Sequence, residues 1–572
     1  MPDIVLFDNS KLLAGGTFFA TGRMDARDII VSPNPAAAPP EVAFGGAEAA
    51  SNLIVYPADY ANMLTWDRSL APRPRLVPLN QEGFRCGFGA GNRMVVAAQD
   101  APCLRHATTL AGWDGIFAAM RQSLAPFWFI QQSIVRELIP EGVDPSSHPE
   151  MGHTGGYGPR ELLRAGLFAF ASQGGYARHG LPIGADADHA IVTGHDEESL
   201  AHSLELNKLA MAESRDYTKF TVDTSHLFHF PTAIPQAALR RLNQVFLGRH
   251  FTIPNIVPGR PGPHFEFDRE EVAALAAKYW RPCVVHKELY DHVVSLRGGM
   301  PFDYELSLDE TPEPTPPREL LFYLVVLYEV LDLPLGAVAS AGPNIGFTKR
   351  HDFEGQLKWL HAQANACASI LHHFEAMLSV HSADGVQART GKGPGVDPVL
   401  RDATGSQLEL KVADVYQEVL WQVLARSPEP EERDLFCEAW RRTCDACNRV
   451  AAVYHTHLAN RRPGEAQSLI NKPHWEAQVA AHHGEDTLRL VQGVAAYGLH
   501  LFRLASDLLP VTDLERPDPQ AELFRRFMFL TYRSLRPALF QTLSSEGWKR
   551  LSRAIEEATM IRLRAMGWSL ET

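Results

Sequence analysis

The chain has 572 residues, of which 45% are hydrophobic and 21% are charged, as in ordinary globular proteins with ordered cores. Its 67 acidic and 54 basic side chains give a net charge of −13 without basic runs, which argues against a surface that binds a phosphate backbone. The start of the chain lacks a basic segment and a cleavage site, and its most apolar stretch, 320–328, is soon followed by Glu329 and Asp332. We therefore expect neither nucleic acid nor a membrane as a partner, and no signal peptide.

The cysteines favour a reducing compartment. There are seven, dispersed along the chain, and an odd number does not suit a framework of disulfides. We therefore predict a cytoplasmic location. Cys444 and Cys447 have the spacing of a redox or zinc pair, but they lie in a stretch that reads as a helix, and a second pair is absent. We interpret them as packing residues.

Three portions follow one another along the chain. Residues 1–110 are rich in Gly and Pro with short apolar runs, which predicts a β-rich N-terminal portion. Between 111 and 426, helical patterns alternate with short strands, the clearest helix being 352–377. This alternation is typical of βα units, so the predicted fold class is α/β with a (β/α)8 TIM-barrel-like catalytic core. Residues 427–572 read as a helical C-terminal region packed on that core.

Two glycine-rich segments do not have the pattern of nucleotide-binding loops. The first, 87–93, is followed by an apolar run that reads as a strand, whereas a dinucleotide fingerprint must lead into a helix. We predict a turn there. The second, 389–395, lacks the upstream Gly and the Ser or Thr of a phosphate loop. Arg93 or Lys392 could still hold a substrate carboxylate, and the alternative is an ordinary surface charge.

The most concentrated chemistry lies in the run Gly184-Ala185-Asp186-Ala187-Asp188-His189, followed some thirty residues later by a strand ending at Asp223. A neutral imidazole beside a carboxylate is what a divalent metal ion and its acid/base partner require. The alternative is that Asp and Gly form a cap and a turn before a helix. Both interpretations are open from these residues alone.

Several predicted strands of the middle portion end at polar residues: Asp223, Asp309 with Glu310, His381 and Lys411. In a (β/α) barrel the carboxyl ends of the strands form the active face, so these side chains are expected to converge. Carboxylate and imidazole ligands of this kind can leave a coordination position open for substrate. For Asp309, capping the helix near residue 317 is an equally good interpretation.

At these residues the sequence resembles the tagaturonate epimerase family, whose members interconvert tagaturonate and fructuronate in hexuronate catabolism. The segment 184–189 is the most specific part of the match, which spans roughly residues 80–540. The other matching stretches are 87–98, 129–138, 220–223, 307–311 and 378–382, with a weaker one at 529–532.

The resemblance implies a metal-dependent isomerase, with a site similar in style to that of class II aldolases. Asp188 would be the proton shuttle, His189 and His381 would be metal ligands, and Glu310 a third ligand with a catalytic role. The implied cofactor is a divalent ion, Zn, Mn, Co or Ni. Asp223 is a further catalytic candidate, and the candidates for substrate binding are Arg93, Asp186 and Lys411.

The implied substrate constrains the reaction, because the epimerised carbon lies β to the ketone and its C–H bond is not acidified. Retro-aldol cleavage and re-addition would suit a metal and a carboxylate. The alternatives are a ketose aldolase, which releases the aldehyde, and a non-catalytic relative that binds sugar acids. The chain departs from the family pattern at 382–385 and 412–414. The expected partner is a small sugar acid, and a homo-oligomer is compatible with the sequence.

Overall fold

The computed structural model describes residues 4–25, 27–91, 110–135, 158–176, 180–309, 311, 313–347, 352–385, 391–412, 415–439 and 535–570. Within these ranges, no helix combines the length and the apolar character needed to cross a membrane. The Cys444 and Cys447 pair and the strand expected after residue 93 lie outside them.

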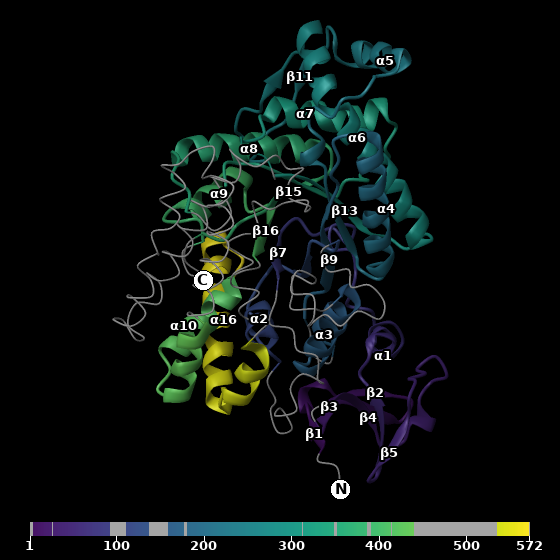
Figure 1. The fold of residues 1–572 in the computed structure, drawn as a ribbon, viewed down its shortest axis with the longest axis vertical. Coiled ribbons are helices and arrows are strands. Elements are labelled where there is room, and N and C mark those ends of the chain that lie inside the picture. Colours follow the sequence, from purple (N-terminus) through teal and green to yellow (C-terminus); the bar gives the residue numbers. More distant parts are fainter. Residues whose placement is uncertain are drawn as a thin grey trace, which may run out of the picture.

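Eight parallel strands close into a barrel at the centre of the molecule (Figure 1). The predicted TIM-barrel-like α/β fold is therefore confirmed. In spatial order the strands run β10, β13, β14, β15, β16, β7, β8 and β9, so that the last strand in the sequence pairs with the first. Their bounds are β7 Gly87–Ala90, β8 Phe127–Gln132, β9 Ile183–Ile191, β10 Lys219–Asp223, β13 Asp303–Leu308, β14 Ser340–Pro343, β15 Met377–Val380 and β16 Leu408–Val412.

Helices follow the strands in the sequence and surround the barrel (Figure 1). Side-chain caps begin two of them, Asp196 for α4 and Asp268 for α6. The helix expected at 352–377 is shorter at both ends, since α8 begins at Leu357 and ends at His373, and Met377 already begins β15. The helices are α2 Trp113–Met120, α3 Pro159–Ser172, α4 Glu197–Glu213, α5 Gln236–Phe246, α6 Arg269–Arg297, α7 Pro317–Val325, α8 Leu357–His373, α9 Val396–Thr404 and α10 Val415–Ala425.

An antiparallel sheet precedes the barrel and lies at the end of the molecule opposite α5 (Figure 1). Helix α1, Tyr60–Thr65, leads from it towards the first barrel strand. Strand β7 belongs to the barrel although it lies within the range 1–110 assigned to the N-terminal portion. The strands of the sheet are β1 Ile4–Leu6, β2 Leu12–Ala14, β3 Thr17–Met24, β4 Arg27–Ser32, β5 Glu48–Ala50 and β6 Leu53–Pro57.

The turn predicted within the glycine-rich segment 87–93 is wrong for its first four residues, which form β7. A Cβ atom at Gly87 would overlap the Trp128 ring, and one at Gly89 would overlap Ile130, both on the neighbouring strand β8. These glycines therefore make room for large side chains inside the barrel.

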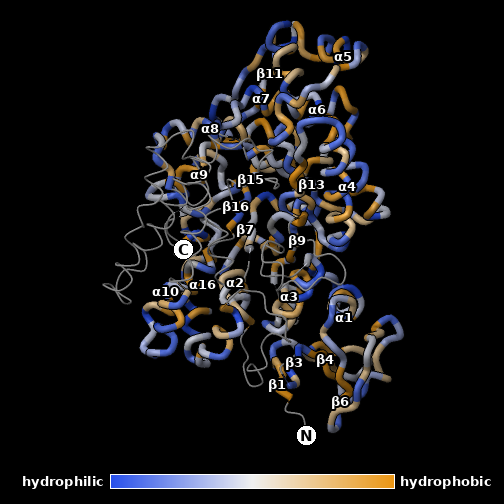
Figure 2. Tube along the Cα trace, viewed as in Figure 1, coloured by the Kyte–Doolittle hydropathy of each residue, from blue (hydrophilic) through white to orange (hydrophobic). Residues whose placement is uncertain are grey.

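The described part of the C-terminal region is helical. Residues 430–439 and 535–542 form helices, and α16, Ser545–Met566, packs against α2, α9 and α10. Its buried face includes Trp548, Leu551 and Ile555. Figure 2 shows hydrophilic and hydrophobic residues mixed along these helices, as expected for segments with one face on the core.

Candidate active site

The interior of the barrel is lined with charged and polar side chains. Lys219 lies in register with Asp186 on one neighbouring strand and Asp303 on the other, so these residues face the same side of the sheet. All three are fully buried. TIM barrels are usually filled with branched apolar residues, and buried charges are costly unless they are paired. Other buried polar residues spaced two apart, on these three strands and on β16, are Asp188, Thr221, Asp223, Glu305, Ser307, Glu409 and Lys411.

Lys219, the first residue of β10, is the centre of one group of paired charges, which lies beside Trp128. The ammonium of Lys219 lies 4.7 Å from the centre of the Trp128 ring. It lies 2.5 Å from Glu305 Oε2 and also contacts Glu409. Burial opposes ionisation of Glu305, but Lys219, Lys411 and His381 outweigh it and hold its pKa well below the usual range.

Lys411, on β16, is the centre of a second group of paired charges. Its ammonium lies 2.7 Å from Asp186, 2.8 Å from Asp188 and 2.6 Å from Glu305. It also donates to Thr221 Oγ1 at 3.0 Å. Burial would raise the pKa of Asp188, but His189, Lys411 and His381 together hold it below its ordinary value. Asp188 is therefore an ionised carboxylate at neutral pH.

His381, immediately after β15, lies between two carboxylates. Its Nε2 is 2.5 Å from Glu305 Oε1, and its Nδ1 is 3.0 Å from Asp309 Oδ1. Burial disfavours the charged ring, but Asp309 and Glu305 outweigh it and raise the pKa of His381 to about 10. Asp309 in turn accepts a hydrogen bond of 2.7 Å from Ser307.

His189 faces this group from β9. Its ring centre is 5.1 Å from that of His381, in an edge-to-face arrangement. Its Nδ1 lies 3.5 Å from Asp223 Oδ2, and its Nε2 lies 3.8 Å from Asp188 Oδ2. The Nδ1 atom is buried and has no hydrogen-bond partner among the described residues. The backbone of His189 has φ 54°, a conformation that persists only where the surrounding structure holds it and that often marks functional sites.

Two groups of three residues have ligand atoms within 4.8 Å of one another: His189, Asp309 and His381, and Asp188, Glu305 and His381. In the second group the ammonium of Lys411 already lies against both carboxylates. In the first, two imidazoles and a carboxylate form a donor set that suits a borderline divalent ion. The first group therefore fits a metal ion better.

Most of the residues proposed from the sequence come together here. The structure gathers Asp186, Asp188, His189, Asp223, His381 and Lys411, whereas Arg93 and Glu310 lie outside the described residues. The segment 183–191 is a strand and α4 begins at Glu197, so Asp186 and Asp188 do not cap a helix.

Asp309 contacts His381 rather than capping α7, whose N-cap is Pro316. Lys392 is not a surface charge, because it is 1% exposed and its ammonium lies 5.3 Å from the Phe347 ring centre.

Sequence reasoning missed three members of the cluster, Lys219, Glu305 and Glu409. The available signal was the spacing of charged residues two apart within apolar strands, as in Glu409 and Lys411, which places both on one face.

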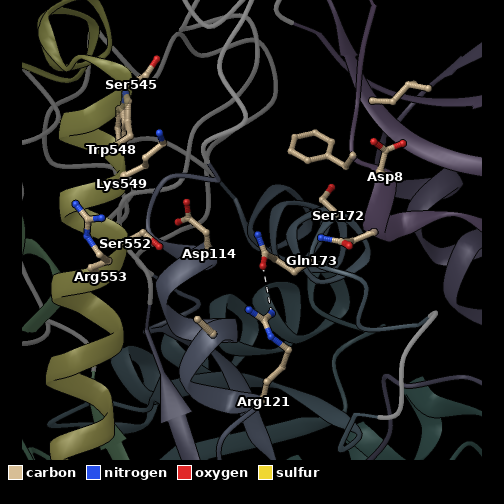
Figure 3. Close-up of a pocket in the computed structure, with 14 residues that line it drawn as sticks. Asp8, Asp114, Arg121, Ser172, Gln173, Ser545, Trp548, Lys549, Ser552 and Arg553 are labelled. Atoms are coloured by element: carbon tan, nitrogen blue, oxygen red, sulfur yellow. Dashed lines mark hydrogen bonds between the residues drawn. The ribbon is translucent and has the colours of Figure 1, made fainter.

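A separate cavity of about 530 Å³ lies among the N-terminal sheet, α2, α3 and α16 (Figure 3). Its lining includes Asp8, Asp114, Arg121, Lys549 and Arg553, and none of the residues of the charged cluster.

Comparisons with known proteins identify relatives of this chain. The model of the tagaturonate epimerase family matches residues 158–456, just over half of the chain. The tagaturonate/fructuronate epimerase of Thermotoga maritima is 26% identical over 396 residues, which are 67% of each chain.

Solved structures show the same fold. The glycerol-complexed crystal structure of fructuronate-tagaturonate epimerase from Cohnella laeviribosi has a TM-score of 0.60 and 17% identity, over 99% of this chain and 96% of that one. The native crystal structure of the same enzyme has a TM-score of 0.58 and 16% identity, with the same shares covered.

Proposed function

The chain belongs to the tagaturonate epimerase family, and on this premise we propose that it is an isomerase that interconverts tagaturonate and fructuronate inside its barrel. The observation that carries the proposal is the group formed by His189, Asp309, His381 and the ionised Asp188. These side chains lie at or near the carboxyl ends of three barrel strands, where TIM-barrel enzymes bind their substrates.

We propose that the enzyme depends on a divalent metal ion, Zn²⁺, Mn²⁺, Co²⁺ or Ni²⁺. His189, His381 and Asp309 would hold it, and Glu310 remains a proposed further ligand. When bound, such an ion supplies Lewis-acid stabilisation of the oxygen that becomes negative during the reaction. Glu305 would accept a hydrogen bond from Nε2 of His381 and leave Nδ1 for the ion, as carboxylates beside metal-bound histidines do.

The proposed chemistry breaks and re-forms a C–C bond. The epimerised carbon lies β to the ketone, so the bond between it and the α carbon can break in a retro-aldol step. Asp188 accepts the proton of the hydroxyl group on the epimerised carbon, and the electrons of that C–C bond move towards the carbonyl. The resulting aldehyde rotates and the bond forms again on its other face. Asp188 then returns the proton to the new hydroxyl, so atoms and electrons balance without a redox cofactor.

Lys411 and Asp223 support the reacting groups in this proposal. The ammonium of Lys411 holds one oxygen of Asp188 and, together with His189 and His381, keeps that carboxylate ionised. Asp223 faces His189 and is itself fixed by the backbone N–H of Ser225 at 2.8 Å. Direct substrate contacts of Arg93, Asp186 and Lys411 stay predictions, as do the cytoplasmic location and the oligomeric state.

The direct test is to incubate the purified protein, with and without added metal ion, with tagaturonate and with fructuronate, and to follow the products by NMR. The proposal predicts the same mixture of the two uronates from either side. Accumulation of a free aldehyde fragment would indicate an aldolase instead. Binding of either uronate without any conversion would indicate a non-catalytic relative.

A further inference from the structure

The guanidinium of Arg562 joins the C-terminal helix α16 to the segment that follows His381. Its Nε lies 2.5 Å from Asp397 Oδ2, and its Nη2 lies 3.0 Å from Asp397 Oδ1. Its Nη1 donates to the backbone carbonyl of Ala383 at 3.2 Å. Asp397 lies in the first turn of α9, so one side chain of α16 holds two other parts of the chain.

This contact is buried and directional. Arg562 is 3% exposed and Asp397 is 7% exposed. The planar guanidinium matches the two carboxylate oxygens and still has a donor for Ala383, which the single ammonium of a lysine would not reproduce. The guanidinium also packs on Gly391, where a Cβ atom would lie 2.6 Å from Cζ of Arg562.

The backbone between His381 and Ala383 couples this contact to the site. Ser382 has φ 53°, in the left-handed region that residues other than glycine rarely adopt without support from their surroundings. Ala383 is fully buried and lies two residues after His381. The bond to its carbonyl therefore restrains the course of the chain as it leaves β15, and with it the position of the His381 ring.

We propose that Arg562 is a positioning residue for His381, so that α16 completes the active site. The inference rests on the proposed function, in which His381 is a metal ligand. Arg562 acts through the backbone at Ala383 and through Asp397. Its loss should displace His381 from its place between Asp309 and Glu305.

Arg550 offers a matched control on the same helix. It is paired with Glu432, which is 1% exposed, at 2.6 Å, and its Nη2 is 3.0 Å from Ser427 Oγ. Arg562→Gln and Arg550→Gln each remove one guanidinium from a buried carboxylate, but only Arg562 contacts the segment after His381. Both variants should lower the melting temperature.

We expect Arg562→Gln alone to weaken Zn²⁺ binding in calorimetry and to lower kcat by about 10–100-fold, the effect of a small displacement of a reacting group. KM should change less. A wild-type Zn²⁺ affinity and kcat in folded Arg562→Gln would overturn the proposal. Equal losses of both quantities in the two variants would also overturn it, because they would show a general effect of destabilisation.

The histidine NMR spectrum gives a readout independent of turnover and metal. The ¹³Cε1–¹H resonance of His381 can be identified by its absence in His381→Gln. The milder Arg562→Lys should shift it, while Arg550→Lys should leave it in place. An unshifted resonance in Arg562→Lys overturns the proposal even if the wild type has no epimerase activity. A shifted resonance with an inactive wild type supports the positioning role and contradicts the proposed function alone.

Discussion

The ammonium of Lys411 and a carboxylate oxygen of Asp188 lie 2.8 Å apart inside the barrel, although the two residues are 223 positions apart in the sequence. The same ammonium also contacts Asp186 and Glu305. Lys411 therefore concentrates three carboxylates near the two histidines and helps to keep Asp188 ionised.

Replacing Lys411 with Met should damage both stability and the acid side of the pH–rate profile. It leaves three buried carboxylates without their shared cation, and breaking a buried pair in this way costs about 3–5 kcal/mol. Because Lys411 helps to lower the pKa of Asp188, its loss raises that pKa, and activity should then begin to fall at a higher pH. Denaturant unfolding and the pH dependence of kcat/KM measure the two effects. Lys549→Met, at an exposed pair on α16, is the control, and an unchanged acid limb in Lys411→Met would contradict the assignment.

Replacing Asp188 with Asn should stop proton transfer without emptying the metal site. The amide keeps the shape of the side chain but loses the basic oxygen. Turnover should fall by about 10²–10⁴-fold, the usual contribution of general acid–base catalysis, with a smaller effect on substrate affinity. Kinetics and metal analysis of the same preparation measure this. Loss of metal would instead make Asp188 a ligand, and near-wild-type turnover would move the proton shuttle to Asp186 or Asp223.

His189→Ala and His381→Ala should each lose the metal ion, because each removes one of three proposed protein ligands. Chelation of the wild type should abolish turnover, and Zn²⁺, Mn²⁺, Co²⁺ or Ni²⁺ should restore it. His195→Ala, at an exposed histidine, is the control. Full activity in rigorously metal-free protein would rule out the proposed metal dependence.

The stability of the metal-free protein should decrease between about pH 6.5 and pH 10. The pKa of His381 is raised to about 10 in the folded state, against about 6.5 in an unfolded chain. A raised histidine pKa contributes stability that is complete below the unfolded value and is lost as the pH rises through the folded value. Urea unfolding at several pH values measures this slope. His381→Gln cannot titrate, so its slope should be smaller, and equal slopes in the two proteins would contradict the prediction.

The sequence is sufficient for the fold class, and it singles out Asp188, His189 and His381, which the structure brings together, because alternating βα patterns and polar strand ends are local features. It was insufficient for Glu305 and Lys219, whose importance depends on how the strands pair around the barrel. A turn is the wrong prediction for Gly87 and Gly89, because their close packing on Trp128 and Ile130 involves a different strand, which the local sequence does not reveal.

Asp309 could be interpreted either as a cap or as a ligand until the structure placed it against His381. Only tertiary geometry makes that distinction, because both roles use the same residue type at the end of a strand.

The most direct test of the account uses tagaturonate that carries deuterium at the epimerised carbon. Cleavage and re-formation of the neighbouring C–C bond leave the bond between this carbon and its deuterium intact. We therefore predict fructuronate that retains the deuterium and is formed at nearly the rate of unlabelled substrate, as followed by NMR. Loss of deuterium to the solvent would indicate proton exchange at this carbon, and a several-fold slower reaction would indicate hydride transfer. Either result, or the absence of fructuronate, would contradict the account.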